Sequence, residues 1–71
     1  MAFSERTKAL VKICVLRSAS QYGKFMVVGV LSTGLLEVHD DLSRDEAKWQ
    51  VSEMSPRLTC HENIEGRDFL E

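Results

Sequence analysis

An uncharged run of twelve residues, from Phe25 to Leu36, restricts the fold of this chain more than any other feature. A helix that crosses a membrane needs about 20 apolar residues, so this run is too short to cross one. Gly29 and Gly34 have the spacing of a phosphate-binding loop, but leucines follow where that loop needs Lys and then Ser or Thr. The run therefore predicts a β-hairpin in the core of a small globular domain.

Two segments rich in β-branched residues, 24–31 and 35–39, form the strands of this predicted hairpin. Ser-Thr-Gly connects them, which is typical of a type I turn followed by a left-handed residue, here Gly34. Pairing outward from the turn then fixes the register. It sets Val30 beside Leu36, Gly29 beside Glu37 and Val28 beside Val38.

Residues 8–17 are also apolar and β-branched, and they predict a strand before the hairpin. Successive side chains of a strand point to opposite faces of its sheet. Strict alternation would place Ala9, Val11, Ile13 and Val15 on one face, and Leu10, Lys12, Cys14 and Leu16 on the other.

The segment 44–55 carries the signals of a helix. Ser43 followed by Glu46 forms a capping box, and Pro56 ends the helical pattern. Ala47, Val51 and Met54 would share one narrow apolar stripe, with Trp49 on nearly the opposite side.

Together these elements predict one α+β domain over residues 1–71, a three-stranded antiparallel β-meander followed by one α-helix. The tail, 57–71, is poorly specified. Residues 57–61 could add a short fourth strand, and the rest could form a turn and a partial helix.

The predicted sheet is apolar on both faces, and a single three-turn helix can cover only one of them. An apolar patch left in water is typical of an association surface. We therefore expect a homodimer, since two-fold dimers are the commonest oligomers. Apolar residues of the tail could instead cover part of the second face.

No constellation of residues points to catalysis or to a bound cofactor. Two cysteines, Cys14 and Cys60, are too few for a secreted disulfide scaffold, which favours reduced thiols in the cytoplasm. Cys60 and His61, like His39 and Asp40, are adjacent, whereas structural zinc sites use spaced pairs, so no metal site is expected.

The charge distribution suggests two surfaces. Residues 37–71 hold ten acidic and four basic side chains, whereas residues 1–36 hold one acidic and five basic side chains. Our first hypothesis is a non-enzymatic protein-binding module, a small inhibitor or adaptor whose acidic helix face binds another protein with a basic surface. Its partner-binding residues would be Trp49, as an anchor, with Asp41, Asp45, Glu46 and Glu53.

The alternative is a nucleic-acid-binding module that uses the basic N-terminal half. Its contacts would be Arg6, Lys8, Lys12, Arg17 and Lys24. The isoelectric point near 5.6 argues against nucleic-acid binding, because domains that bind nucleic acid are typically basic. A third and weaker hypothesis is a subunit of an enzyme with a shared active site.

Overall fold

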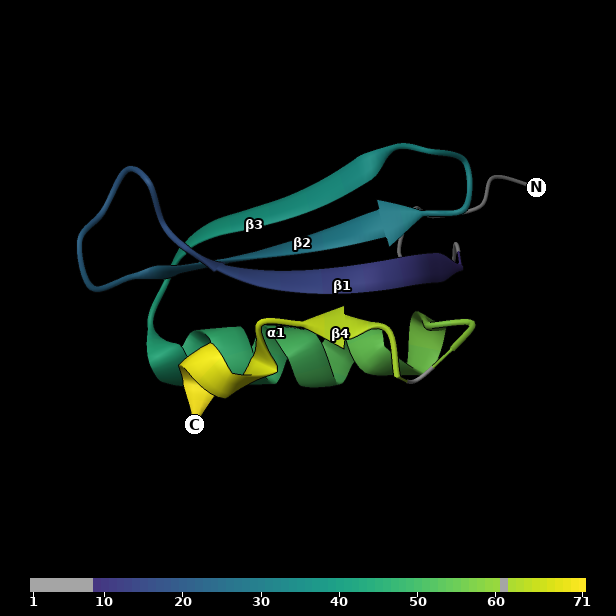
Figure 1. Ribbon diagram of the computed structural model, residues 1–71. Helices are drawn as coiled ribbons and strands as arrows, with labels where there is room; N and C mark the ends of the chain where they lie inside the picture. The colour runs from purple at the N-terminus through teal and green to yellow at the C-terminus, as the bar shows by residue number, and fades with distance from the viewer. Residues whose placement is uncertain (1–8, 61) are drawn as a thin grey trace.

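The computed structural model describes residues 9–60 and 62–71, and it confirms an α+β fold (Figure 1). Three antiparallel strands, β1 (Leu10–Arg17), β2 (Phe25–Leu31) and β3 (Leu36–Leu42), are followed by helix α1 (Arg44–Met54). A short fourth strand completes a sheet with the order β3-β2-β1-β4. Within the described residues, no helix is long and apolar enough to cross a membrane.

The β2–β3 hairpin has the register predicted from its turn. Val30 pairs with Leu36, Gly29 with Glu37, and Val28 with Val38. Gly34 has a φ of 93°, the left-handed conformation that a residue without a Cβ adopts at little cost. Because the turn fixes the register, it also fixes which side chains of β3 face the helix.

Strand β1 departs from strict alternation at its beginning. Its pairing with β2 shifts between Leu10 and Lys12, so that Val11 is an extra residue. A bulge of this kind moves the following side chains to the other face. Leu10 is therefore fully buried together with Ile13 and Val15, and its predicted place on the opposite face is wrong.

Helix α1 packs on one face of the sheet through the predicted stripe, because Ala47, Val51 and Met54 are all buried. The capping box is present: the Glu46 N–H donates to Ser43 Oγ at 3.2 Å, and the Ser43 N–H donates to Glu46 Oε1 at 3.0 Å. The helix ends at Met54, and Pro56 lies in the 3₁₀ turn η2 (Ser55–Arg57) that follows.

The tail returns to the far edge of β1. Its strand is β4 (Ile64–Glu65), which pairs in parallel with β1, and not the predicted segment 57–61. Of the described residues 57–60, only Leu58 makes a bridge, an isolated one to Leu10. The 3₁₀ turn η3 (Arg67–Leu70) follows and buries Leu70. The core therefore lies between the sheet, α1 and the tail, all on one side of the sheet.

The other side of the sheet, called the open face below, is covered by no described element. Side chains there alternate with the buried positions of β1 and β2 and with Glu37 and His39 of β3. The open face comprises Lys12, Cys14, Leu16, Met26, Val28, Val30, Leu36 and Val38, with Glu65 of β4 beside Cys14.

Substituting the N-cap of α1 tests the capping box. Ser43→Ala removes the oxygen that accepts the Glu46 N–H, and we expect a loss of about 1 kcal/mol in the free energy of unfolding. In a domain of this size that loss corresponds to a fall in melting temperature of roughly 4–8 °C, measurable by circular dichroism. Ser52→Ala, on an exposed position of the same helix, is the control and should leave the melting temperature nearly unchanged. Equal melting temperatures for both variants would contradict the cap.

Candidate functional site: the outer surface of helix α1

Trp49 stands on the outer surface of α1 with 61% of its area exposed. Asp45 precedes it by four residues and Glu53 follows it by four, so one carboxylate lies about one helical turn to either side. We call the two carboxylates, Asp45 and Glu53, the acidic row. From the sequence, Trp49 could also have packed under the tail, against Ile64 or Phe69. Its exposure excludes this, and the Phe69 ring lies under the Arg17 guanidinium at 5.7 Å.

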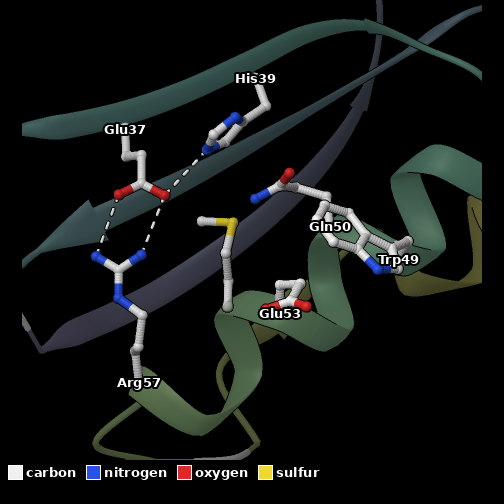
Figure 2. A pocket seen from close by; sticks show the side chains of 7 residues that line it. Glu37, His39, Trp49, Gln50, Glu53 and Arg57 are labelled. Carbon is white, nitrogen blue, oxygen red and sulfur yellow. Dashed lines mark hydrogen bonds and ion pairs between the residues drawn. The ribbon is translucent and has the colours of Figure 1, made fainter. Parts of the chain in front are cut away.

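A hollow of about 380 Å³ lies between α1 and strand β3, with Trp49 and Glu53 on its helical side. Figure 2 shows Glu37 of β3 at its other end, held by two partners. Arg57 donates to both oxygens of the Glu37 carboxylate at 3.1 Å, and His39 Nε2 lies 3.0 Å from Oε2. Only 14% of the Arg57 side chain and 16% of that of Glu37 are exposed, so this ion pair is largely shielded from water.

The pKa of Glu37 reflects two opposing effects. Burial alone would raise it, because a carboxylate loses solvation beside the sheet. Hydrogen bonds and charge from Arg57 and His39 outweigh burial and hold the pKa below its ordinary value. Glu37 is therefore a fixed anion at neutral pH, and the wall of the hollow carries an already compensated charge.

A second hollow, of about 300 Å³, lies on the other side of Trp49 and is lined by Leu42, Asp45, Glu46 and Gln50. One carboxylate at this hollow, that of Glu46, takes part in the helix cap, whereas that of Glu37 at the first hollow is paired with an arginine. The Ser43 N–H holds the pKa of Glu46 below its ordinary value. Glu46 thus contributes negative charge to this hollow, while one of its oxygens already accepts a hydrogen bond.

Asp41 lies apart from the acidic row. It occupies an irregularity of β3, where the pairing with β2 shifts and its φ is 59°. It lines neither hollow. The structure thus brings together four of the five predicted partner-binding residues, Asp45, Glu46, Trp49 and Glu53, along one helix, and places Asp41 at the end of the neighbouring strand.

The basic residues of the alternative hypothesis are dispersed. Arg6 and Lys8 lie outside the described residues. Lys12 bonds to Glu65 at 2.8 Å on the side of the open face, whereas Arg17 lies on the helix side against Phe69. Arg17 and Lys24 do line one small hollow of about 100 Å³, together with the fully exposed Tyr22.

The groups capable of metal or thiol chemistry are also apart. Among residues 9–60 and 62–71, no three His, Cys, Asp or Glu side chains gather closely enough to hold an ion. Cys14 is half-buried on the open face and Cys60 is exposed, and both are free thiols. His61, considered with Cys60 as a ligand, lies outside the described residues.

Sequence patterns gave no sign of the Glu37–Arg57 ion pair. The two residues are 20 positions apart, on a strand and on a turn after the helix, and neither lies in a recognisable motif. The only available signal was the predicted place of Glu37 opposite Gly29, and it is the structure that shows this position to lie on the face that α1 covers. Comparison with known proteins gives no match to a family model, a curated protein or a solved structure.

Proposed function

We propose that this chain is a non-enzymatic protein-binding module, a small inhibitor or adaptor, and that the outer surface of α1 binds a basic segment of another protein. The observation that carries the proposal is the exposure of Trp49 between two carboxylates and two hollows. A large aromatic ring is costly to leave in water, and tryptophan is enriched among the residues that dominate binding energy.

The charge around Trp49 indicates the chemistry of the partner. The carboxylates of Asp45 and Glu53 lie on either side of the ring, and Glu46 adds a third negative charge. A Lys or Arg side chain can lie over the face of an indole ring and pair with a carboxylate at the same time. A basic helix or loop would therefore place its apolar stem on Trp49 and its charges on the acidic row.

The cytoplasm is the compartment that we propose for this interaction. Cys14 and Cys60 are unpaired and lie on different surfaces, as expected where thiols stay reduced.

The single tryptophan of the chain provides a direct test. Titration with synthetic peptides rich in Lys and Arg should shift the Trp49 emission to shorter wavelength, because binding removes the ring from water. Peptides of the same length in which Glu replaces the basic residues should give no shift. Affinity purification from host cells, with wild type and Trp49→Ala as parallel baits, would then identify the natural partner.

Trp49→Ala should weaken the binding of the basic partner by about 2 kcal/mol or more, roughly a 30-fold rise in Kd. The melting temperature should stay nearly unchanged, since the ring is largely exposed. Lys48→Ala, the neighbouring position of α1, is the control and should retain binding. A large fall in melting temperature for Trp49→Ala, or capture of the same partners by both baits, would refute the proposal.

We also propose that the module works as a homodimer. The open face supports this, because the tail that could have covered it packs elsewhere: Leu58 and Leu70 are buried on the helix side of the sheet. Light scattering on a sizing column should give twice the monomer mass of 8.1 kDa. A species of 8.1 kDa at all accessible concentrations would contradict the dimer.

A further inference from the structure

We infer that two copies of this chain associate through their open faces, forming a sandwich of two sheets with the α1 helices on the outside. This inference rests on the proposed homodimer and names the surface that forms it. Seven side chains of the open face are apolar or, for Cys14, a thiol, and its two charged side chains, Lys12 and Glu65, pair with each other at 2.8 Å. Leu36 and Val38 are 60% and 53% exposed and, with their neighbours on β2, form a contiguous apolar patch.

The size of the open face fits a two-sheet interface. Strands of seven and eight residues, at about 3.3 Å per residue and about 4.8 Å apart, make a surface about 23 Å long and 14 Å wide. That plane measures about 330 Å² before the relief of the side chains is counted. Because this is less than the roughly 500 Å² per partner of the smallest stable interfaces, we expect a weak and reversible dimer.

The charges on the open face are compensated within the chain, so they do not repel a second copy. Lys12 of β1 pairs with Glu65 of β4 at 2.8 Å, and Asp40 accepts a hydrogen bond from Ser20 Oγ at 3.0 Å. The uncharged part of the face lies over β2 and β3, around Val28 and Val38. An apolar area beside a neutralised ion pair suits a second copy of itself, whereas a strongly basic or acidic partner would find no unmatched charge on it.

The edges of the sheet are poorly suited to self-association, which favours the face. Edge strands resist pairing when they are short, charged or bulged. Strand β3 carries four charged or titratable residues and is interrupted at Asp41, while β4 has only two residues. A dimer that continued the sheet from edge to edge would also leave both open faces in water.

The face-to-face arrangement keeps the two binding functions apart. Helix α1 covers the opposite side of the sheet, so its outer surface points away from the dimer interface (Figure 1). A dimer would therefore present two acidic rows on opposite sides. Association of the copies and binding of a basic partner would not compete for the same residues.

Neighbouring leucines of the hairpin provide a matched pair of variants. Leu36 belongs to the open face and Leu35 lies beside the turn, outside the strand, and their exposed fractions are 60% and 57%. Leu36→Lys would set an unpaired positive charge against the apolar face of the second copy and should raise the dissociation constant of the dimer about 100-fold. Leu35→Lys adds the same charge to the same hairpin and should leave the dimer intact.

Sedimentation equilibrium on the full chain would measure these constants, with circular dichroism melts to confirm that each variant folds. Val38→Lys is the second face variant should Leu36→Lys fail to fold. Alkylation gives an independent readout: Cys14 should react more slowly than the exposed Cys60 in the wild type, and the difference should shrink in Leu36→Lys.

A wild-type dimer that only the face variants dissociate supports the inference. A dimer that survives Leu36→Lys and Val38→Lys, or one that Leu35→Lys dissociates equally, overturns the face and leaves the homodimer itself standing. A monomeric wild type overturns both. Neither result bears on the binding of a basic partner, which Trp49→Ala tests separately.

Discussion

Gly66→Ala is expected to lower the free energy of unfolding by about 3 kcal/mol, a large part of the stability of so small a domain. Gly66 has a φ of 76°, and a residue with a side chain pays about 1–2 kcal/mol for that left-handed conformation. An added Cβ would also press against the carbonyl oxygen of Val15 in β1. The contact is with backbone, so β4 and η3 would have to move away from the sheet. Urea denaturation followed by circular dichroism measures the loss.

Two other glycines separate the backbone effect from the steric one. Gly23 and Gly34 also have positive φ values, 80° and 93°, but a Cβ at either position would meet no atom within 4 Å. Alanine at these turns should cost only about 1–2 kcal/mol. If all three substitutions cost the same, the close approach of Gly66 to Val15 contributes nothing to stability.

Arg57→Met is expected to cost about 3 kcal/mol at pH 7, because it leaves the Glu37 carboxylate shielded from water without its bidentate partner. Methionine keeps the apolar stem of the arginine, so that loss of packing is small. The double variant Glu37→Gln/Arg57→Met removes the stranded charge and should recover much of the stability. Chemical denaturation of both variants and of Glu37→Gln completes the cycle. If the double variant is no more stable than Arg57→Met, the ion pair is not the cause of the loss.

The same variant should reverse the response of this site to acid. In the wild type the pKa of Glu37 lies below its ordinary value, so its stabilising effect is present above about pH 4.5 and is lost as the pH falls through the lowered pKa. Without Arg57, burial raises the pKa of Glu37. Protonation of Glu37 then removes the free-energy cost of holding a charged carboxylate away from water. The stability difference between wild type and Arg57→Met should therefore shrink between pH 7 and pH 4. A constant difference would contradict this account.

Local signals in the sequence predicted the elements whose geometry is fixed by near neighbours. The register of the hairpin follows from its three-residue turn, and the start of α1 follows from Ser43 and Glu46. The bulge at Val11 and the position of β4 could not be predicted in this way. The bulge depends on the pairing of β1 with β2, about 20 positions away, and β4 depends on pairing with residues about 50 positions away, where hydrophobic periodicity carries no information.

In the candidate site, too, features set by local geometry could be predicted from the sequence, and features set by long-range packing could not. The spacing of Asp45, Trp49 and Glu53 along one helix could be predicted, because helical geometry alone sets it. The exposure of Trp49 could not, since it depends on where the tail packs. The Glu37–Arg57 pair joins two elements distant in the chain, and only the folded arrangement brings them together.

The parallel pairing of β4 with β1 also has a consequence during synthesis on the ribosome. Ile13 hydrogen-bonds to Asn63 and pairs with Ile64, so the outer edge of β1 must wait for residues translated about 50 codons later. At 5–20 residues per second this delay is roughly 3–10 s, far longer than a hairpin needs to form. During that interval the nascent meander presents both an unpaired strand edge and an apolar face, the two kinds of surface through which incompletely folded chains aggregate.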